Sequence, residues 1–136
     1  MAESKIQKFN HLKLHTQYSI CEGAIKIDEL KDYLKDNKTK SIALCDTSNL
    51  CGALEFAEKI SKTGAQPIIG TQINFKYADT IGLLPLFALN EKGYKRMIEL
   101  SSLSYLKNNE MTEPHIDLDE IFHKTEGLAL FSGTVF

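Results

Sequence analysis

Residues 41–75, SIALCDTSNLCGALEFAEKISKTGAQPIIGTQINF, contain the pattern that decides the fold. The stretch Ser41–Cys45 is short and almost entirely apolar, which is typical of a strand buried on both faces. A helix is predicted from about Leu50 to Thr63 and is closed by Gly64. A second buried strand follows at Gln66–Phe75. Strand, helix and strand at this spacing predict a right-handed βαβ unit with parallel strands.

The sequence on either side continues this alternation of strands and helices. Residues Tyr94, Met97, Ile98 and Ser101 are spaced to form one buried helical face. The further elements predicted are strands at Phe9–Leu14, Ile81–Ala88 and Gly127–Phe131, and helices at Ile27–Leu34, at Glu91 to about Leu106 with Asn90 as its cap, and near Leu118–His123. The sequence therefore predicts an α/β fold in which mostly parallel strands alternate with helices, as an open sheet or an incomplete barrel.

Composition excludes several classes of function. The 136 residues suit one domain or a piece of one, and 43% of them are hydrophobic. A net charge of -2 lacks the basic surplus of a nucleic-acid binder, so we do not expect this segment to contact DNA directly. The longest apolar run, Ile81–Leu89, is too short to span a membrane, and the polar N-terminus is not a signal peptide. We expect a cytoplasmic protein.

The three cysteines, Cys21, Cys45 and Cys51, form no C-x-x-C pair, and their number is odd. This pattern argues against a disulfide framework and against a zinc knuckle. Free thiols in a reducing cytoplasm are the interpretation that we prefer.

Functional side chains of such folds gather at the carboxyl ends of strands, which directs attention to three segments. In the first, His11, Lys13 and His15 share one face of the predicted strand, because side chains alternate with a period of two. Two imidazoles are potential zinc ligands, but the ammonium group between them would repel a divalent cation. Histidines hydrogen-bonded in a polar pocket are the alternative interpretation.

The second segment places Asp46 and Thr47 at a strand end. Asp46 is a candidate metal ligand or general base, whereas a helix-capping role for 46–49 is the alternative. The third segment contains Gln72, whose uncharged amide is a weak ligand for a catalytic dication. His115 and His123 are interpreted as ordinary surface or capping residues. The sequence contains no Gly-rich phosphate loop and no paired-carboxylate motif, so this segment is not expected to carry out nucleotidyl transfer.

Several stretches, in this order along the chain, resemble the start of the catalytic alpha subunits of bacterial DNA polymerase III. They are FNHLKLHTQYSICEGAIKIDEL from residue 9, ALCDTSNLCGALEFAE from residue 43, GAQPIIGTQI from residue 64, FALNEKGYKRMIELSS from residue 87 and EGLALFSG from residue 126. The resemblance implies that 1–136 are the N-terminal portion of a PHP (polymerase and histidinol phosphatase) domain, a distorted α/β barrel. The rest of that domain and the polymerase domains would lie outside this chain.

Active members of that family carry a metal cluster that hydrolyses phosphoesters. By the resemblance, their His-x-His pair falls on His11 and Lys13, and an acidic ligand falls on Glu22. Their Asp-His pair falls on Asp46 and Thr47, and a further acid falls on Gln72. An ammonium, a hydroxyl and a carboxamide thus replace metal donors. We therefore expect a metal-free, non-hydrolytic remnant of the pocket with no catalytic residue of its own.

The resemblance also implies a role within a larger enzyme. The parent protein would be a DNA-directed DNA polymerase that uses Mg²⁺, and this segment would be a structural and docking module. Its partners would be the rest of the alpha subunit and, as in some members, the proofreading exonuclease. Two alternatives stay open: an active metal-dependent phosphoesterase of the histidinol-phosphatase type, and a stand-alone interaction protein with no polymerase attached.

Overall fold

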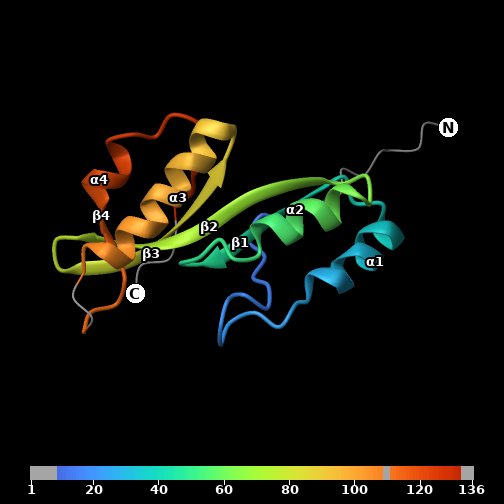
Figure 1. Ribbon diagram of the computed structural model, residues 1–136, viewed down its shortest axis with the longest axis horizontal. Coiled ribbons are helices and arrows are strands. Elements are labelled where there is room, and N and C mark those ends of the chain that lie inside the picture. The colour runs from blue at the N-terminus through green and yellow to red at the C-terminus, as the bar shows by residue number, and fades with distance from the viewer. Residues whose placement is uncertain (1–8, 109–110, 133–136) are drawn as a thin grey trace.

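The computed structural model describes residues 9–108 and 111–132, and it confirms an α/β fold. In Figure 1, α2 lies along β1 and β2, and α3 lies along β3. The elements in chain order are α1 (Ile27–Asn37), β1 (Ser41–Thr47), α2 (Ala53–Ser61), β2 (Gln66–Tyr77), β3 (Thr80–Ala88), α3 (Glu91–Leu106), β4 (Ile116–Asp117), α4 (Leu118–Phe122) and β5 (Leu128–Leu130). Sequence reasoning missed the two-residue strand β4.

The sheet mixes parallel and antiparallel pairs. Its order is β1-β2-β3-β5, with β4 paired to β2. Strands β1 and β2 are parallel from Ser41↔Gln66 to Thr47↔Gln72, as the βαβ pattern predicts. The expectation of mostly parallel strands does not extend to β3, which is antiparallel to β2 and to β5. Only Ala78 and Asp79 connect β2 to β3, and two residues can form a hairpin but not a parallel crossover.

The predicted strand at Phe9–Leu14 is wrong: this segment runs beside β1 without forming a regular strand. Its carbonyls at His11 and Leu14 accept hydrogen bonds from Ala43 N and Cys45 N, each at 2.9 Å. Three residues of the N-terminal segment therefore oppose two residues of β1, so one extra residue disrupts the ladder as a bulge does. The regular alternation that would have put His11, Lys13 and His15 on one strand face is lost.

The helices cover one face of the sheet. Ile42 and Leu44 of β1 pack with Phe56 and other residues of α1 and α2, while Ala43 and Cys45 pack on the opposite face with Phe87. A second cluster joins α3 to β2, β3 and β5. The sheet does not close into a barrel within the residues described here.

Helix α3 begins where predicted, because Asn90 Oδ1 accepts a hydrogen bond from Gly93 N at 3.0 Å. Its predicted buried face is only partly right, since Met97 is buried but Ile98 is 42% exposed. Gly93 sets the rotation of the helix: a Cβ at this position would lie 1.7 Å from the carbonyl oxygen of Gly127. The face turned to the sheet is therefore Gly93, Met97, Leu100 and Ser104.

All three cysteines are free, with Cys21 and Cys51 exposed and Cys45 buried. Burial raises the pKa of Cys45 to about 12, so its thiol stays neutral at physiological pH. Among the helices in the described part of the chain, none is long and apolar enough to cross a membrane.

Candidate functional site

Asp46, near the end of β1, is at the centre of a group of polar residues at the carboxyl end of that strand. Its side chain is completely buried. One carboxylate oxygen accepts hydrogen bonds from Thr16 N and Ser19 Oγ, both at 2.6 Å, and the other accepts from Thr16 Oγ1 at 2.7 Å. The carbonyl of Asp46 accepts from Thr71 Oγ1 at 2.7 Å. Asp46 therefore joins the loop around 16–19 to the strands β1 and β2.

Gly52 lies close to this carboxylate and to the ring of Tyr18. A Cβ at Gly52 would lie 2.7 Å from the ring of Tyr18 and 3.4 Å from Asp46 Oδ2, so the absence of a side chain lets the tyrosine ring lie close. Gly52 is also the residue that precedes α2, and no side chain caps that helix. The capping alternative for 46–49 is thus wrong: Asn49 Oδ1 instead accepts from Cys51 N at 3.0 Å, before the helix begins.

Next to Asp46, a second chain of hydrogen bonds joins Glu22, Thr47 and Gln72. The hydroxyl of Thr47 donates to the carboxylate of Glu22 and accepts from Gln72 Nε2, the latter at 2.7 Å. Because the hydroxyl has one hydrogen and an ionised carboxylate can only accept, the amide must present its NH₂ group to Thr47. This orientation leaves Gln72 Oε1 buried, with no hydrogen-bond partner among the described residues.

We call the residues Thr16, Ser19, Glu22, Asp46, Thr47 and Gln72 the Asp46 network. It includes four of the seven predicted pocket residues, namely Glu22, Asp46, Thr47 and Gln72. The two series of hydrogen bonds, around Asp46 and around Thr47, meet at Ser19, whose hydroxyl also accepts a hydrogen bond from Thr47 N at 3.1 Å.

The other three predicted residues lie apart from this network. His11, Lys13 and His15 line a crevice of about 500 Å³ between the N-terminal segment and α1, which also reaches Glu22. His15 Nδ1 lies 3.9 Å from Glu22 Oε2, which is too far for a hydrogen bond. The structure thus divides the predicted pocket into a hydrogen-bonded half and an open half that meet at Glu22.

The donor set of the Asp46 network does not fit a cluster of divalent cations. Three of the roughly four lone-pair positions of the Asp46 carboxylate already accept hydrogen bonds. Thr47 directs its hydrogen at Glu22, and Gln72 offers one neutral oxygen. A metal cluster needs many anionic or imidazole donors. Within 9–108 and 111–132, no three His, Cys, Asp or Glu side chains gather in an arrangement that would hold a metal ion.

Sequence reasoning missed Thr16 and Ser19, although both are almost completely buried. The sequence did contain a signal: Thr16 and Ser19 are the first and last residues of the short polar stretch 16–19, which comes soon after the apolar Leu14. A hydroxyl that is buried in such a position requires a hydrogen-bond partner. What the sequence did not indicate is that Asp46, 27 to 30 positions away, is that partner.

A surface network of charged residues borders the site. Tyr18 OH donates to Glu55 Oε2 at 2.5 Å, and Lys59 bridges Glu55 and Asp28 at 2.6 and 2.9 Å. Hydrogen bonds from Lys31 and then Lys59 lower the pKa of Asp28 from 3.8 to about 2. This surface ion network, Asp28, Lys31, Glu55 and Lys59 with Tyr18, links α1, α2 and the loop around 16–19.

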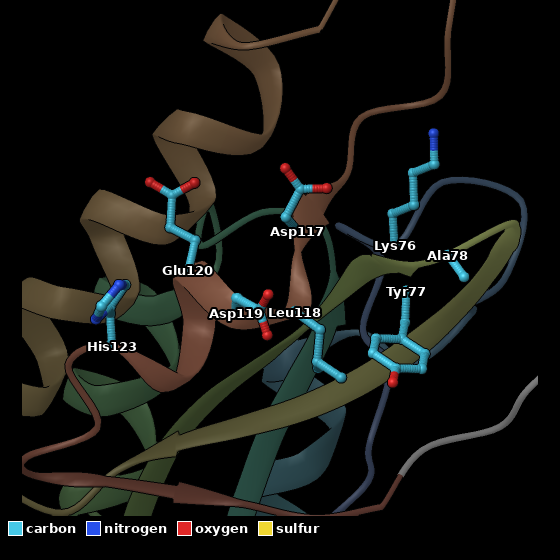
Figure 2. A pocket seen from close by; sticks show the side chains of 8 residues that line it. All are labelled: Lys76, Tyr77, Ala78, Asp117, Leu118, Asp119, Glu120 and His123. Carbon is cyan, nitrogen blue, oxygen red and sulfur yellow. The ribbon is translucent and has the colours of Figure 1, made fainter.

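A second cavity, of about 530 Å³, lies between the β2–β3 turn and α4 (Figure 2). In Figure 2, Lys76 and Tyr77 point to opposite sides of their strand, and Asp117 and Glu120 extend to the same side as Lys76. Glu120 is already paired with Lys107 at 2.5 Å. His123 is an exposed residue at the C-terminal end of α4, as the surface interpretation predicts.

Comparison with known proteins identifies the family. Residues 11–136 match the family described as the PHP domain. Proteins named DNA polymerase III subunit alpha are similar to this chain: that of Rickettsia felis is 39% identical over 122 residues, and that of Caulobacter vibrioides is 37% identical over 144 residues. These alignments cover 89% and 98% of this chain but 10% and 12% of the relatives. The chain therefore spans about a tenth of the length of the curated relatives it matches.

Solved structures share the fold at low identity. An amidohydrolase from Chromobacterium violaceum, solved with bound sulfate and no metal, superposes with a TM-score of 0.57 at 16% identity, over 72% of this chain and 34% of its own. A putative metal-dependent phosphoesterase from Bifidobacterium adolescentis gives a TM-score of 0.52 at 16% identity, over 84% and 42%. Together with the family match over almost the whole chain, the shared fold shows that this chain belongs to the PHP domain family.

Proposed function

We propose that residues 1–136 are the N-terminal portion of the PHP domain of a bacterial replicative DNA polymerase alpha subunit. The proposal draws on identities of 33–39% to proteins named DNA polymerase III subunit alpha. In this proposal, nucleotidyl transfer with Mg²⁺ belongs to other domains of the parent enzyme in the cytoplasm. This segment is a scaffold that packs against the rest of the subunit and presents a surface to the proofreading exonuclease, without contacting DNA directly.

In the same proposal this segment is non-hydrolytic, and the observation that supports this is the set of hydrogen bonds to the Asp46 carboxylate. Its buried carboxylate accepts hydrogen bonds from Thr16 and Ser19, so those donors hold the loop in place without a metal ion. The Thr47 hydroxyl bridges Glu22 and Gln72 in the same way. Side-chain hydrogen bonds thus hold these residues in place, as dications would in a metal-dependent relative.

Electrostatics supports the same conclusion. A dication near the first segment would be repelled by the ammonium group of Lys13, which carries charge of the same sign. Of the residues that match the family's ligands, only His11, Glu22 and Asp46 keep donor character. Glu22 is shared with Thr47, and Asp46 with Thr16 and Ser19.

The test is metal analysis combined with a phosphodiesterase assay on the full-length protein. We expect well under one equivalent of zinc or manganese after dialysis, the same thermal midpoint with and without EDTA, and no phosphodiester hydrolysis attributable to this domain. Stoichiometric metal that is lost in His11→Ala, together with hydrolysis that EDTA abolishes, would overturn the proposal.

The alternative function is an active metal-dependent phosphoesterase. One observation favours it: a structural neighbour of this fold is named a putative metal-dependent phosphoesterase. The hydrolysis measurement above separates the two functions. A further check separates the polymerase proposal from a stand-alone interaction protein: the polymerase proposal expects an uninterrupted reading frame about ten times as long as this chain, since the chain spans 10–12% of its relatives.

A further inference from the structure

Exposed apolar side chains lie on three segments around the carboxyl end of β1. Ile20, on the loop that follows residue 16, is 85% exposed, and Leu54, in the first turn of α2, is 72% exposed. Tyr105, near the C-terminal end of α3, is 54% exposed. The exposed thiols of Cys21 and Cys51 lie next to Ile20 and three residues before Leu54. We call these five residues the apolar patch.

Hydrogen bonds and one ring contact bring the three segments together. The hydroxyl of Tyr105 donates to Ser48 O at 3.0 Å, which holds the end of α3 beside the turn after β1. Asn49 Nδ2 donates to Tyr18 O at 2.9 Å, which holds the loop around 16–19 beside the same turn. The ring of Tyr18 also lies against Gly52, where a Cβ would be only 2.7 Å away. The apolar patch therefore surrounds one turn of the chain, 48–52.

The loop that carries Ile20 is fixed at its base, although it is neither a helix nor a strand. Thr16 and Ser19 both donate to the buried carboxylate of Asp46. Gly23 N donates to Ser19 O at 2.9 Å, and a Cβ at Gly23 would lie 2.1 Å from Thr16 O, so the two ends of the loop are close together. Because the loop is already ordered, covering Ile20 would cost little conformational entropy.

The charges beside the apolar patch favour a permanent contact. Several large apolar side chains exposed on one surface indicate an interaction site. The carboxylates of Glu22 and Glu55, which adjoin the patch along the chain, already have partners in Thr47 and Lys59. Glu58, one turn further along α2, is exposed and suits a polar rim. An apolar centre with charges at its edge is typical of permanent interfaces.

We propose that the apolar patch is the docking surface for an apolar part of the same polypeptide that follows residue 136 in the full-length protein. Ile20 and Leu54 are its anchors, because covering them removes the most apolar surface from water. The relatives are about ten times as long as this chain, so most of such a subunit lies outside it. The inference rests on the proposed function in one respect, namely that this chain is the N-terminal portion of a longer subunit.

The experiment is maleimide labelling of the purified full-length protein, read by mass spectrometry of the peptides that contain Cys21, Cys45 and Cys51. Cys45 is buried within this segment and is the internal reference for a covered thiol. We expect Cys21 and Cys51 to react at least about a hundredfold more slowly than in urea, as Cys45 does, since a covered thiol reacts only when its contact opens. Labelling of both at close to the rate in urea would overturn the inference.

Two further measurements identify what covers the apolar patch. Protection should be the same at all concentrations of the purified protein, because the occupant belongs to the same chain. Protection that is lost on dilution would indicate a second copy. Protection that appears only after a proofreading exonuclease is added would indicate a separate partner. Either of these results would overturn the assignment to the same polypeptide.

Variants locate the contact. Ile20→Ser removes most of an anchor, so it should speed labelling of Cys51 at least about tenfold and lower the thermal midpoint of the full-length protein. Leu54→Ser should do the same for labelling of Cys21. Ile20→Val, the matched control, keeps most of the apolar surface and should retain most of the protection. Unchanged labelling and midpoints in both serine variants would overturn the inference, because substitutions at uncovered surface positions have little effect.

The proposed function fails separately from this inference. Phosphodiester hydrolysis that zinc or manganese supports and EDTA stops would contradict the non-hydrolytic assignment, whatever the labelling rates are. If the full-length protein binds no metal and hydrolyses no phosphodiester, but Cys21 and Cys51 react as fast as in urea, only the docking inference is wrong.

Discussion

The Asp46 network and the surface ion network lie next to each other, and both contain a carboxylate with several partners. Asp46 is completely buried and accepts hydrogen bonds from neutral donors of one loop. Asp28 is largely exposed and pairs with Lys31 and Lys59, each at 2.9 Å. The buried carboxylate of Asp46 holds the loop in place because no water molecule can replace it as the acceptor for Thr16 and Ser19. Water and salt ions readily substitute for the lysine partners of the exposed Asp28.

The largest expected effect comes from removing the buried carboxylate. Asp46→Ala leaves the donors of Thr16 and Ser19 buried without an acceptor, so we expect a loss of about 3–5 kcal/mol in the free energy of unfolding. Urea denaturation measures it. The matched control is Asp36→Ala, an exposed aspartate on α1, which should change stability by no more than about 0.5 kcal/mol. Similar effects from both variants would contradict the contrast between buried and exposed carboxylates.

A smaller effect is expected at the second half of the Asp46 network. Thr47→Val keeps the shape but removes the hydroxyl that joins Glu22 to Gln72. The NH₂ group of Gln72 then has no acceptor in its buried position, and we expect a loss of about 1–3 kcal/mol, again measured by urea denaturation. Thr47→Ser, which retains the hydroxyl, should recover most of it. An unchanged stability in Thr47→Val would contradict the role of these hydrogen bonds, and a loss in Thr47→Ser as large as in Thr47→Val would mean that the methyl group contributes as much as the hydroxyl.

The smallest effect concerns the exposed carboxylate and depends on pH. The pKa of Asp28 is lowered from 3.8 to about 2, so the folded state favours its ionised form. The stabilisation is therefore complete above about pH 4 and is lost as the pH falls through about 2. Thermal midpoints of the wild-type chain and of Asp28→Asn should differ slightly near pH 5 and converge near pH 2. Added salt should shrink the difference, and a gap that survives acid and salt would contradict a screened surface pair.

Much of the fold was predictable because it depends on short-range pattern. The unit of β1, α2 and β2 follows from apolar runs separated by one helix, and the start of α3 follows from the capping chemistry of Asn90. The antiparallel β3 was not predicted, since the turn at Ala78 and Asp79 contains no glycine or asparagine. Ala78 nevertheless adopts a left-handed conformation with φ of 52°.

The candidate site shows the same division. The sequence by itself determined the chemical types present: an ammonium at Lys13, a hydroxyl at Thr47 and a carboxamide at Gln72, none of which carries the negative charge or imidazole nitrogen that a cluster of dications needs. Only the tertiary structure decided that Asp46 is enclosed by Thr16 and Ser19, and that the basic residues face a separate crevice. The physical reason is range: side-chain chemistry belongs to each residue, whereas hydrogen-bond partners come from segments that meet only when the chain folds.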